Sequence, residues 1–284
     1  MPELPEVEWV VRGLNRTLAG ATIGSATVHR PRSLRPTLPE ALERALAGAR
    51  VQSVQRRGKY LLLHLTPAKG DSPLVVCAHL GMTGRMHVVP AEHPLPRHAV
   101  VSMDLGSRRF VFEDARGFGR FTLDVTPVSQ LGPEPLSESF SPESLAASTS
   151  GSRQPIKPFL LDQSRVAGVG NIYASESLFR ARVHPGRPAG SLSADEAVRL
   201  HDAIRAVLSE SIAAAEAGDA GTRFYYGDDG TQAEGGDSRF LVYDRAGEPC
   251  PACGAAIQRQ VQAGRSSFFC AACQPLRRPK KRRS

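Results

Sequence analysis

Residues 250–273 read CPACGAAIQRQVQAGRSSFFCAAC, and this stretch decides the fold of the C-terminal end. Its four cysteines form two C-x2-C pairs separated by sixteen residues, the spacing of a site in which four thiolates bind one zinc ion. Two disulfides are the alternative, but the chain shows no sign of export to an oxidising compartment. We therefore expect one structural Zn²⁺, since four protein ligands leave no open position for catalysis. The expected ligands are Cys250, Cys253, Cys270 and Cys273.

Between the cysteine pairs, apolar residues lie on both sides of Ala263-Gly264. This pattern predicts a β-hairpin, so the element is expected to be a zinc ribbon. A fifth cysteine, Cys77, lies in an apolar run and is expected to be a small buried residue rather than a reactive thiol.

The other end of the chain begins MPELPEVE. If Met1 is removed, the ring nitrogen of Pro2 becomes a free secondary amine, and α-amino groups titrate near pH ~7.7 to 8.0. Such an amine can attack an aldehyde-like carbon to form an iminium, and the neighbouring Glu3 could transfer the protons. The alternative is a simple helix start, because apolar residues recur at helical spacing toward Gly20. That helix does not by itself explain a second proline and a second acid ahead of it.

The middle of the chain changes from strand-like to helical patterns. In its first half, short β-rich runs are separated by Gly, Pro and Ser, which predicts a sandwich or barrel. The expected strands are 51–54, 59–65, 74–80, 85–89, 100–105 and 108–113. A Pro/Ser-rich stretch over 127–142 predicts a linker. The clearest helix beyond it is 193–218, with Ser193 and Glu196 as a capping box.

Composition excludes membrane proteins and very small domains. With 284 residues and 41% apolar content, the chain can bury a full core and form two domains. Its longest apolar runs are far below the ~20 residues that cross a bilayer, and the acidic N-terminus lacks the basic region of a signal peptide. We therefore expect a soluble, cytoplasmic protein without a membrane partner.

The net charge of +8 is concentrated at the C-terminus. Residues 274–284 read QPLRRPKKRRS and carry six positive charges and no negative ones, which leaves +2 for the other 273 residues. Such a tail is typical of a disordered solubilising appendage, with specific recognition as the alternative. Either form strengthens attraction to a polyanion such as DNA.

Six motifs occur in the order found in formamidopyrimidine-DNA glycosylases, which this chain resembles. They are PELPEVE at 2–8, GKY at 58–60, HLGMTG at 79–84, DARGFG at 114–119, GVGNIYASE at 168–176 and the four-cysteine element. The resemblance covers nearly the whole chain. Leu4 makes the start similar to this group rather than to the related endonuclease VIII group, whose members begin Pro-Glu-Gly-Pro-Glu.

The resemblance implies an α+β multidomain fold: an N-terminal helix plus β-sandwich, then a helix-two-turns-helix domain that ends in a zinc ribbon hairpin. The expected divisions are a catalytic domain 1–132, a linker 133–142, the helix-two-turns-helix domain 143–220, a lesion-capping loop 221–239, the zinc ribbon 240–274 and a basic tail 275–284. The capping loop carries four acids, a departure from the family pattern.

The resemblance also implies a function in base excision repair. The enzyme would remove oxidised purines, chiefly 8-oxoguanine and formamidopyrimidines, and then cut the DNA at the abasic site by β- and δ-elimination. Pro2 would attack C1′ and hold the sugar as an iminium, Glu3 would protonate the sugar oxygen, and Glu6 would position groups near the lesion. The expected partner is double-stranded DNA, bound by a monomer.

Further roles follow from the same resemblance. A base cannot be reached inside the stack, so it must be flipped out and replaced by a wedge. Met82 would fill the vacated space, Phe118 would wedge the opposite strand, and Arg116 would hydrogen-bond to the orphaned base. Without the family, Met82 and Phe118 would be interpreted as core residues, although their glycine neighbours favour exposed turns.

The remaining predicted site residues contact the lesion or the backbone. Lys59 would lie near the active site, where it could donate a proton during elimination. Arg265 would enter the minor groove and take part in δ-elimination, and Lys157 would line the lesion pocket. The expected DNA contacts are His98, Arg116, Arg153, Lys157, Asn171 and Arg265. Taken alone, Lys59 and His98 would be solvated surface residues, and Arg265 a solvated hairpin arginine.

Two other functions remain open from the sequence. One is a sibling glycosylase that prefers oxidised pyrimidines. The other is a non-catalytic DNA-binding protein with a zinc ribbon.

Overall fold

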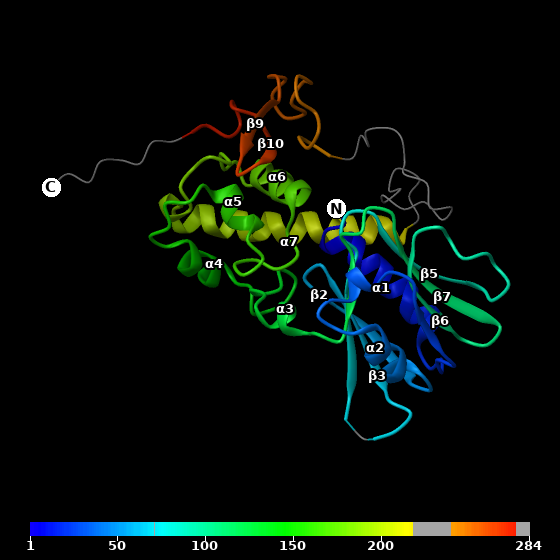
Figure 1. Cartoon of the computed structure of the whole chain (residues 1–284). Helices are drawn as coiled ribbons and strands as arrows, with labels where there is room; N and C mark the ends of the chain where they lie inside the picture. Colours follow the sequence, from blue (N-terminus) through cyan, green and yellow to red (C-terminus); the bar gives the residue numbers. More distant parts are fainter. Residues whose placement is uncertain (71, 218–239, 277–284) are drawn as a thin grey trace. The chain divides into compact units, whose positions relative to one another are not determined.

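The computed structural model describes residues 1–70, 72–217 and 240–276. Two compact units make up the chain, Met1–Gln130 and Leu131–Ser284. Figure 1 colours the first from blue to green and the second from green to red. Among the described residues, no helix has the length and apolar character needed to cross a membrane.

The first unit begins with helix α1, Leu4–Leu18, in which Pro5 occupies the first turn. A proline is tolerated there because its missing N–H would have no partner in the helix. The apolar residues at helical spacing are buried, so the predicted helix is confirmed. Asn15 fixes the helix to the sheet, because its Nδ2 donates to Val54 O at 2.6 Å and its Oδ1 accepts from Val54 N at 2.8 Å.

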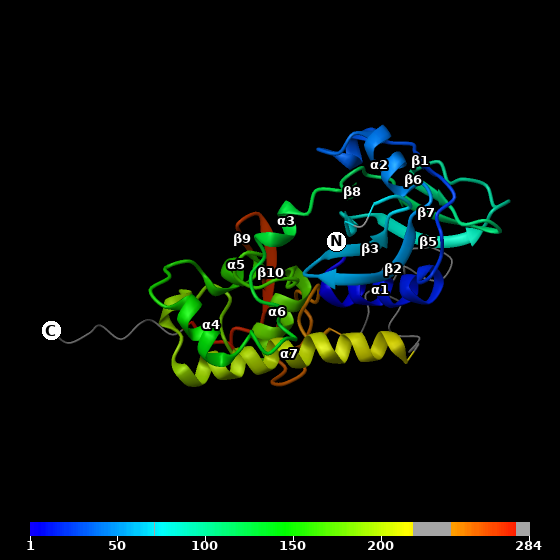
Figure 2. The same cartoon turned by 90° about the horizontal axis from the view of Figure 1, so that it is seen from below.

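Two antiparallel four-stranded sheets enclose the core of this unit, in the orders β1-β6-β7-β5 and β2-β3-β4-β8. The strands are β1 Ala26–Val28, β2 Arg50–Arg57, β3 Tyr60–Thr66, β4 Leu74–His79, β5 Gly84–Pro90, β6 Ala99–Asp104, β7 Arg108–Asp114 and β8 Arg120–Thr122. Apolar side chains from α1 and both sheets form one hydrophobic cluster, which confirms the expected N-terminal helix plus β-sandwich. Helix α1 runs beside β2 and β3, as Figure 2 shows.

Strand β3 illustrates how the pattern sets the faces of a sheet. Leu61, Leu63 and Leu65 are buried in the core, while the residues between them are less buried. Alternation of this kind follows from the two-residue period of a strand. Cys77 in β4 is buried as expected, and burial raises the pKa of its thiol to about 11.

Three small elements of the first unit were not expected from the sequence. They are strand β1, strand β8 and helix α2, Pro39–Leu46, which follows a short 3₁₀ turn at Pro31–Leu34. A short helix α3, Thr126–Ser129, occupies the start of the Pro/Ser-rich stretch over 127–142, just before the boundary between the units.

The second unit is built around the long helix α7, Ala194–Glu216, which contacts α4, Pro142–Thr149, and α6, Asn171–Arg180. The capping box predicted for α7 is confirmed. Ser193 N donates to Glu196 Oε2 at 2.9 Å, and Glu196 N donates to Ser193 Oγ at 3.3 Å. Helix α5, Ile156–Leu161, completes this group of helices (Figure 2).

The C-terminal hairpin consists of β9, Gln258–Gln262, and β10, Arg265–Phe269. Ala263 and Gly264 both have positive φ, as a tight hairpin turn requires, so the predicted hairpin is confirmed. Strand β10 contacts α6. The predicted capping loop lies outside the described residues, as does the basic tail from residue 277 onward.

Candidate functional site

The N-terminus of α1 brings together three of the residues that the sequence predicts for catalysis. Pro2, Glu3 and Glu6 are all buried. The backbone N–H of Glu3 donates to Glu6 Oε2 at 2.8 Å. Glu6 therefore satisfies a donor that the helix cannot use and fixes the backbone of Glu3.

The terminal amine lies in a mixed electrostatic environment. Burial lowers the pKa of the Met1 α-amino group, the carboxylates of Glu3 and Glu6 oppose this shift, and the positive charges of Lys59 and Arg116 reinforce it. Four predicted site residues thus act on one amine, although they come from α1, the β2–β3 turn and the loop after β7. A lower pKa increases the uncharged fraction of an amine at neutral pH.

Lys59 occupies the turn between β2 and β3 and is buried. The turn is tight because Gly58 adopts a φ of +58°. Arg56 anchors it, since its Nε donates to Glu8 Oε2 at 2.8 Å and its Nη1 donates to Gly58 O at 3.2 Å. Helix α1 and this turn are therefore held together by an ion pair that is largely shielded from solvent.

The motif HLGMTG forms the turn between β4 and β5. Met82, at its tip, keeps 41% of its surface exposed. His79 Nδ1 accepts a hydrogen bond from Gly81 N at 3.0 Å. Burial lowers the pKa of His79 to about 4, with smaller effects from the positive charges of Lys59 and Arg120. The ring is therefore neutral at physiological pH and can serve as this acceptor.

The motif DARGFG forms the loop between β7 and β8. Phe118 is 55% exposed, and the Arg116 guanidinium carbon lies 5.2 Å from the centre of its ring. Two predicted wedge residues thus stack on each other at the surface. Large exposed apolar side chains such as Met82 and Phe118 are notable because neither contributes to the core.

His98 lies just before β6 and is held by Arg30. Arg30 Nη2 lies 2.6 Å from His98 Nδ1, and Arg30 Nη1 donates to Asp114 O at 2.9 Å. A guanidinium has donors only, so His98 Nδ1 is the acceptor and the neutral ring carries its proton on Nε2. No sequence motif marks Arg30, because its partners are distant in the chain.

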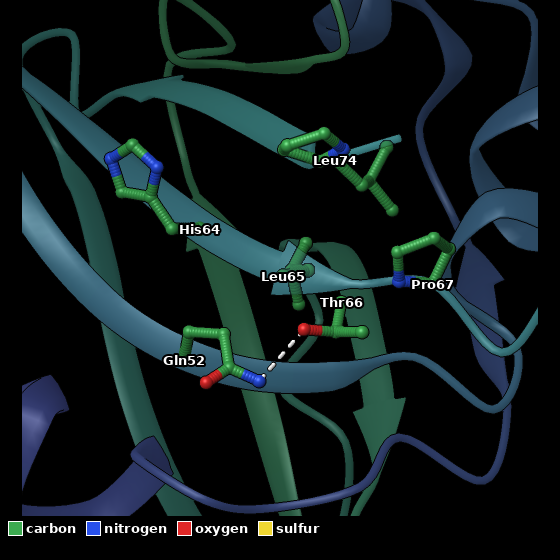
Figure 3. A pocket seen from close by; sticks show the side chains of 7 residues that line it. Gln52, His64, Leu65, Thr66, Pro67 and Leu74 are labelled. Carbon is green, nitrogen blue, oxygen red and sulfur yellow. Dashed lines mark hydrogen bonds between the residues drawn. The ribbon is translucent and has the colours of Figure 1, made fainter. Parts of the chain in front are cut away.

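Figure 3 shows a pocket at the C-terminal end of β3. The Lys59 turn precedes the other end of this strand. Gln52, His64, Thr66 and Leu74 are among its lining residues. Gln52 Nε2 donates to Thr66 Oγ1 at 2.8 Å across the pair of strands. The lining includes none of the predicted site residues, so this pocket is separate from the cluster around the amine.

In the second unit, Asn171 begins helix α6. Its Oδ1 is buried and makes no hydrogen bond within the described part of the chain. Gln163 shapes the preceding glycine loop, because its Nε2 donates to Val169 O at 2.8 Å and its Oε1 accepts from Gly168 N at 2.9 Å. The start of α6 is therefore a fixed glycine loop that leads into a helix, and the positive end of the helix dipole favours an anion there.

Lys157 and Arg265 lie close together at the zinc ribbon. Lys157 is only 1% exposed, and its Nζ donates to Ser266 O at 2.7 Å. Arg265, the neighbouring residue, is exposed at the start of β10. Lys157 thus fixes the strand that carries Arg265. Arg153, the last predicted contact, is exposed ahead of α5.

The four ribbon cysteines form the expected structural zinc site. Their sulfur atoms all lie within 4.8 Å of one another. The Sγ atoms of Cys250 and Cys273 are 3.9 Å apart and those of Cys253 and Cys270 are 3.5 Å apart, well beyond the ~2.05 Å of a disulfide bond. The disulfide alternative is therefore wrong, and the donor set of four thiolates suits one tetrahedral zinc ion.

Comparison with known proteins agrees with this arrangement. Three family models match: "Formamidopyrimidine-DNA glycosylase N-terminal domain" over residues 1–121, "Formamidopyrimidine-DNA glycosylase H2TH domain" over 131–223, and "Zinc finger found in FPG and IleRS" over 247–276. The formamidopyrimidine-DNA glycosylase of Chloroflexus aurantiacus is 44% identical, and the match covers 96% of this chain and 98% of that protein.

Two solved structures of the Lactococcus lactis enzyme are also similar. One, a variant in complex with DNA that contains Fapy-dG, is 33% identical with a TM-score of 0.85 and covers 96% of this chain and 100% of the other. The second, in complex with DNA that contains an abasic site, is 33% identical with a TM-score of 0.84 and covers 96% and 99%. From the matched models, the zinc site and these relatives, we conclude that the chain belongs to the formamidopyrimidine-DNA glycosylase family.

Proposed function

We propose that this chain is a bifunctional DNA glycosylase and abasic-site lyase that removes oxidised purines from double-stranded DNA. The observation that supports this most directly is the N-terminal amine beside Glu3, Glu6 and Lys59, whose pKa is lowered by desolvation although the two carboxylates oppose the shift. Removal of Met1 passes the terminal amine to Pro2, which is itself buried at the same helix start. The uncharged amine is the form that can attack carbon.

The reaction begins when the Pro2 nitrogen attacks C1′ of the damaged nucleotide. The bond from C1′ to the base breaks, and the base leaves with the electron pair and takes up a proton. The Glu3 carboxylate takes the proton that the Pro2 nitrogen releases and donates it to the sugar ring oxygen as the ring opens, so that C1′ and the Pro2 nitrogen form an iminium. Glu6 holds Glu3 in place through its hydrogen bond to the backbone.

The iminium then makes the C2′ proton acidic. Loss of this proton breaks the bond from C3′ to its phosphate, and a second elimination releases the phosphate on C5′. Lys59, buried next to the amine, donates a proton during these steps. Water finally hydrolyses the iminium and frees Pro2.

Met82, Arg116 and Phe118 open the duplex in this proposal. The two apolar side chains are exposed on adjacent turns, where they can enter the stack and replace the extruded nucleotide. Arg116 supplies hydrogen-bond donors for the base that is left without a partner.

The other predicted residues bind the DNA backbone. His98 offers its Nε2–H, and Asn171 lies at the start of α6, where the helix dipole favours a phosphate. Arg153 adds an exposed positive charge, and Arg265 enters the minor groove from the ribbon. Lys157 contributes by fixing Ser266 O beside Arg265. A short hairpin cannot hold an arginine rigidly without its metal, so the role of the zinc ion is to stabilise the hairpin and position Arg265.

Borohydride trapping tests the proposal. Protein shown by mass spectrometry to begin at Pro2 is mixed with a duplex that contains 8-oxoguanine opposite cytosine, and sodium borohydride reduces any iminium to a stable adduct. We expect an adduct of protein and DNA for the unmodified chain, and loss of that adduct when an extra residue precedes Pro2.

The matched control is Pro5→Ala, which changes a buried proline of the same helix without touching the terminal amine. It is expected to retain trapping. Absence of an adduct with both the 8-oxoguanine duplex and an abasic duplex would refute the catalytic role of Pro2. A duplex with thymine glycol tests lesion choice, since faster excision there would indicate an enzyme for oxidised pyrimidines.

A further inference from the structure

The two turns that carry Met82 and Phe118 are packed directly against each other. A Cβ atom added to Gly81 would lie 2.7 Å from the backbone of both Phe118 and Gly119. Gly81 also has a φ of +62°, which most side chains avoid. The backbones of the turns are therefore in contact, with no side chain between them.

One buried carboxylate joins these turns. Asp114, with no exposed surface, is the last residue of β7 and pairs with Gly84 at the start of β5. Its Oδ1 accepts from Thr83 Oγ1 at 2.5 Å and from Arg116 N at 3.1 Å, and its Oδ2 accepts from Gly119 N at 2.6 Å. Both oxygens are thus occupied by donors from the two turns.

Thr83 closes the arrangement from the other side. Its hydroxyl donates to Asp114 and at the same time accepts from Arg116 N at 3.1 Å. Thr83 follows Met82 directly, so this hydroxyl links the first turn to the second. Behind the carboxylate, Arg30 Nη1 donates to the carbonyl of Asp114.

We infer that Asp114 and Thr83 are positioning residues that make Met82 and Phe118 act as one rigid wedge. This rests on the proposed role of those two side chains in base extrusion. Separating stacked bases costs free energy, so the duplex opposes the insertion of Met82 and Phe118. A loop that is fixed only at its two ends would be displaced instead of opening the stack. Hydrogen bonds to a buried carboxylate resist that displacement, because breaking one leaves a polar group without a partner away from water.

Only a carboxylate satisfies this set of donors. An amide at position 114 keeps one acceptor oxygen, and its NH₂ group must then face either Gly119 N or the Thr83 hydroxyl and Arg116 N. In either orientation, Asp114→Asn therefore removes the residue-114 acceptor from one backbone N–H of the second turn, that of Arg116 or that of Gly119. Because this buried change threatens folding, the milder Thr83→Val, which removes only the bridging hydroxyl, is the primary test.

Extrusion is measured by stopped-flow fluorescence with 2-aminopurine next to an 8-oxoguanine in duplex DNA. We expect Thr83→Val to slow the fluorescence rise roughly tenfold, the factor that corresponds to loss of a hydrogen bond worth about 1.4 kcal/mol. Thr83→Ser keeps the hydroxyl and is expected to restore the rate. Thr66→Val is the matched control, since its hydroxyl bonds to Gln52 at the other end of β3.

A second readout separates positioning from general damage. In a chain that already carries Met82→Ala and Phe118→Ala, the added Thr83→Val should have no further effect on extrusion, because the side chains it positions are gone. Equal extrusion rates for Thr83→Val and Thr83→Ser would overturn the inference. So would a loss of rate shared by Thr66→Val.

If the proposed function is wrong, the experiments give a different set of results. In that case the unmodified chain itself forms no borohydride adduct with an abasic duplex. If the unmodified chain traps and excises normally while Thr83→Val extrudes the base at the wild-type rate, the catalytic proposal stands and only the positioning role is refuted.

Discussion

Acid should weaken the first unit, and His79 should make the largest contribution among its histidines, because its pKa is lowered furthest. His79 is neutral in the folded chain, where its pKa is about 4, whereas in the unfolded chain its pKa returns to the usual value near 6.5. The unfolded state therefore binds a proton first as the pH falls. The contribution of the neutral His79 ring to the free energy of unfolding is complete above pH ~6.5 and is lost progressively between pH ~6.5 and about 4.

The size of the effect follows from that difference. A shift of roughly 2.5 pH units, at about 1.4 kcal/mol per unit, corresponds to about 3 kcal/mol of unfolding free energy at pH 4 and below. His79→Asn supplies the comparison, because its side-chain oxygen can accept from Gly81 N and does not titrate. Chemical denaturation of both proteins at several pH values isolates the histidine, since other groups cancel in the difference.

NMR checks the same reasoning at the residue itself. The ring signals of His79 should titrate with a midpoint near 4 and show the proton on Nε2 above it, since Nδ1 accepts from Gly81 N. A midpoint near 6.5, or a stability difference between the two proteins that does not change from pH 7 to 4, would refute the account of this turn.

Three further predictions concern the second unit. Removal of zinc by a chelator should abolish DNA binding while leaving the melting of the first unit unchanged, because zinc holds only the ribbon; unchanged affinity after verified metal loss would contradict this. Lys157→Met should leave Ser266 O unpartnered, costing about 1–3 kcal/mol, and should reduce δ-elimination relative to β-elimination on sequencing gels if Arg265 is thereby misplaced. Glu176 accepts from three consecutive backbone N–H groups, those of residues 241–243, so Glu176→Gln should speed hydrogen exchange there by about tenfold or more, and wild-type exchange rates would argue against this anchor.

Elements with a long, regular pattern could be predicted from the sequence, and short ones could not. The alternation of apolar residues over 60–66 and their helical spacing over 4–18 each indicate an element with one buried face. Both elements, β3 and α1, are present. Strand β8 has three residues and exists because Phe121 pairs with Ala78 in β4, a contact that no local pattern records. Its pairing is a property of the folded chain alone.

The same limit applies to the candidate site. The ribbon cysteines carry their chemistry in residue type and spacing, so they could be identified in the sequence. Pro2 and Glu3 could be proposed from the same kind of signal. Asp114 lies within a motif that drew attention for its arginine and phenylalanine, but its own role depends on Thr83, which is 31 residues away. A buried acid whose partners are mainly backbone N–H groups leaves no pattern of charges to detect.

The bonds to Asp114 also have a consequence for engineering. In the loop after β7, the hydrogen bonds to the carboxylate come from the backbone N–H groups of Arg116 and Gly119 and do not involve the side chain of Arg116. Backbone atoms of this loop are thus held by Asp114, while its side chains at positions 116 and 118 are the atoms proposed to touch DNA. Libraries that vary positions 116 and 118 can therefore change what touches a nucleic acid without removing the scaffold beneath it, which makes this loop a modular place to redesign specificity.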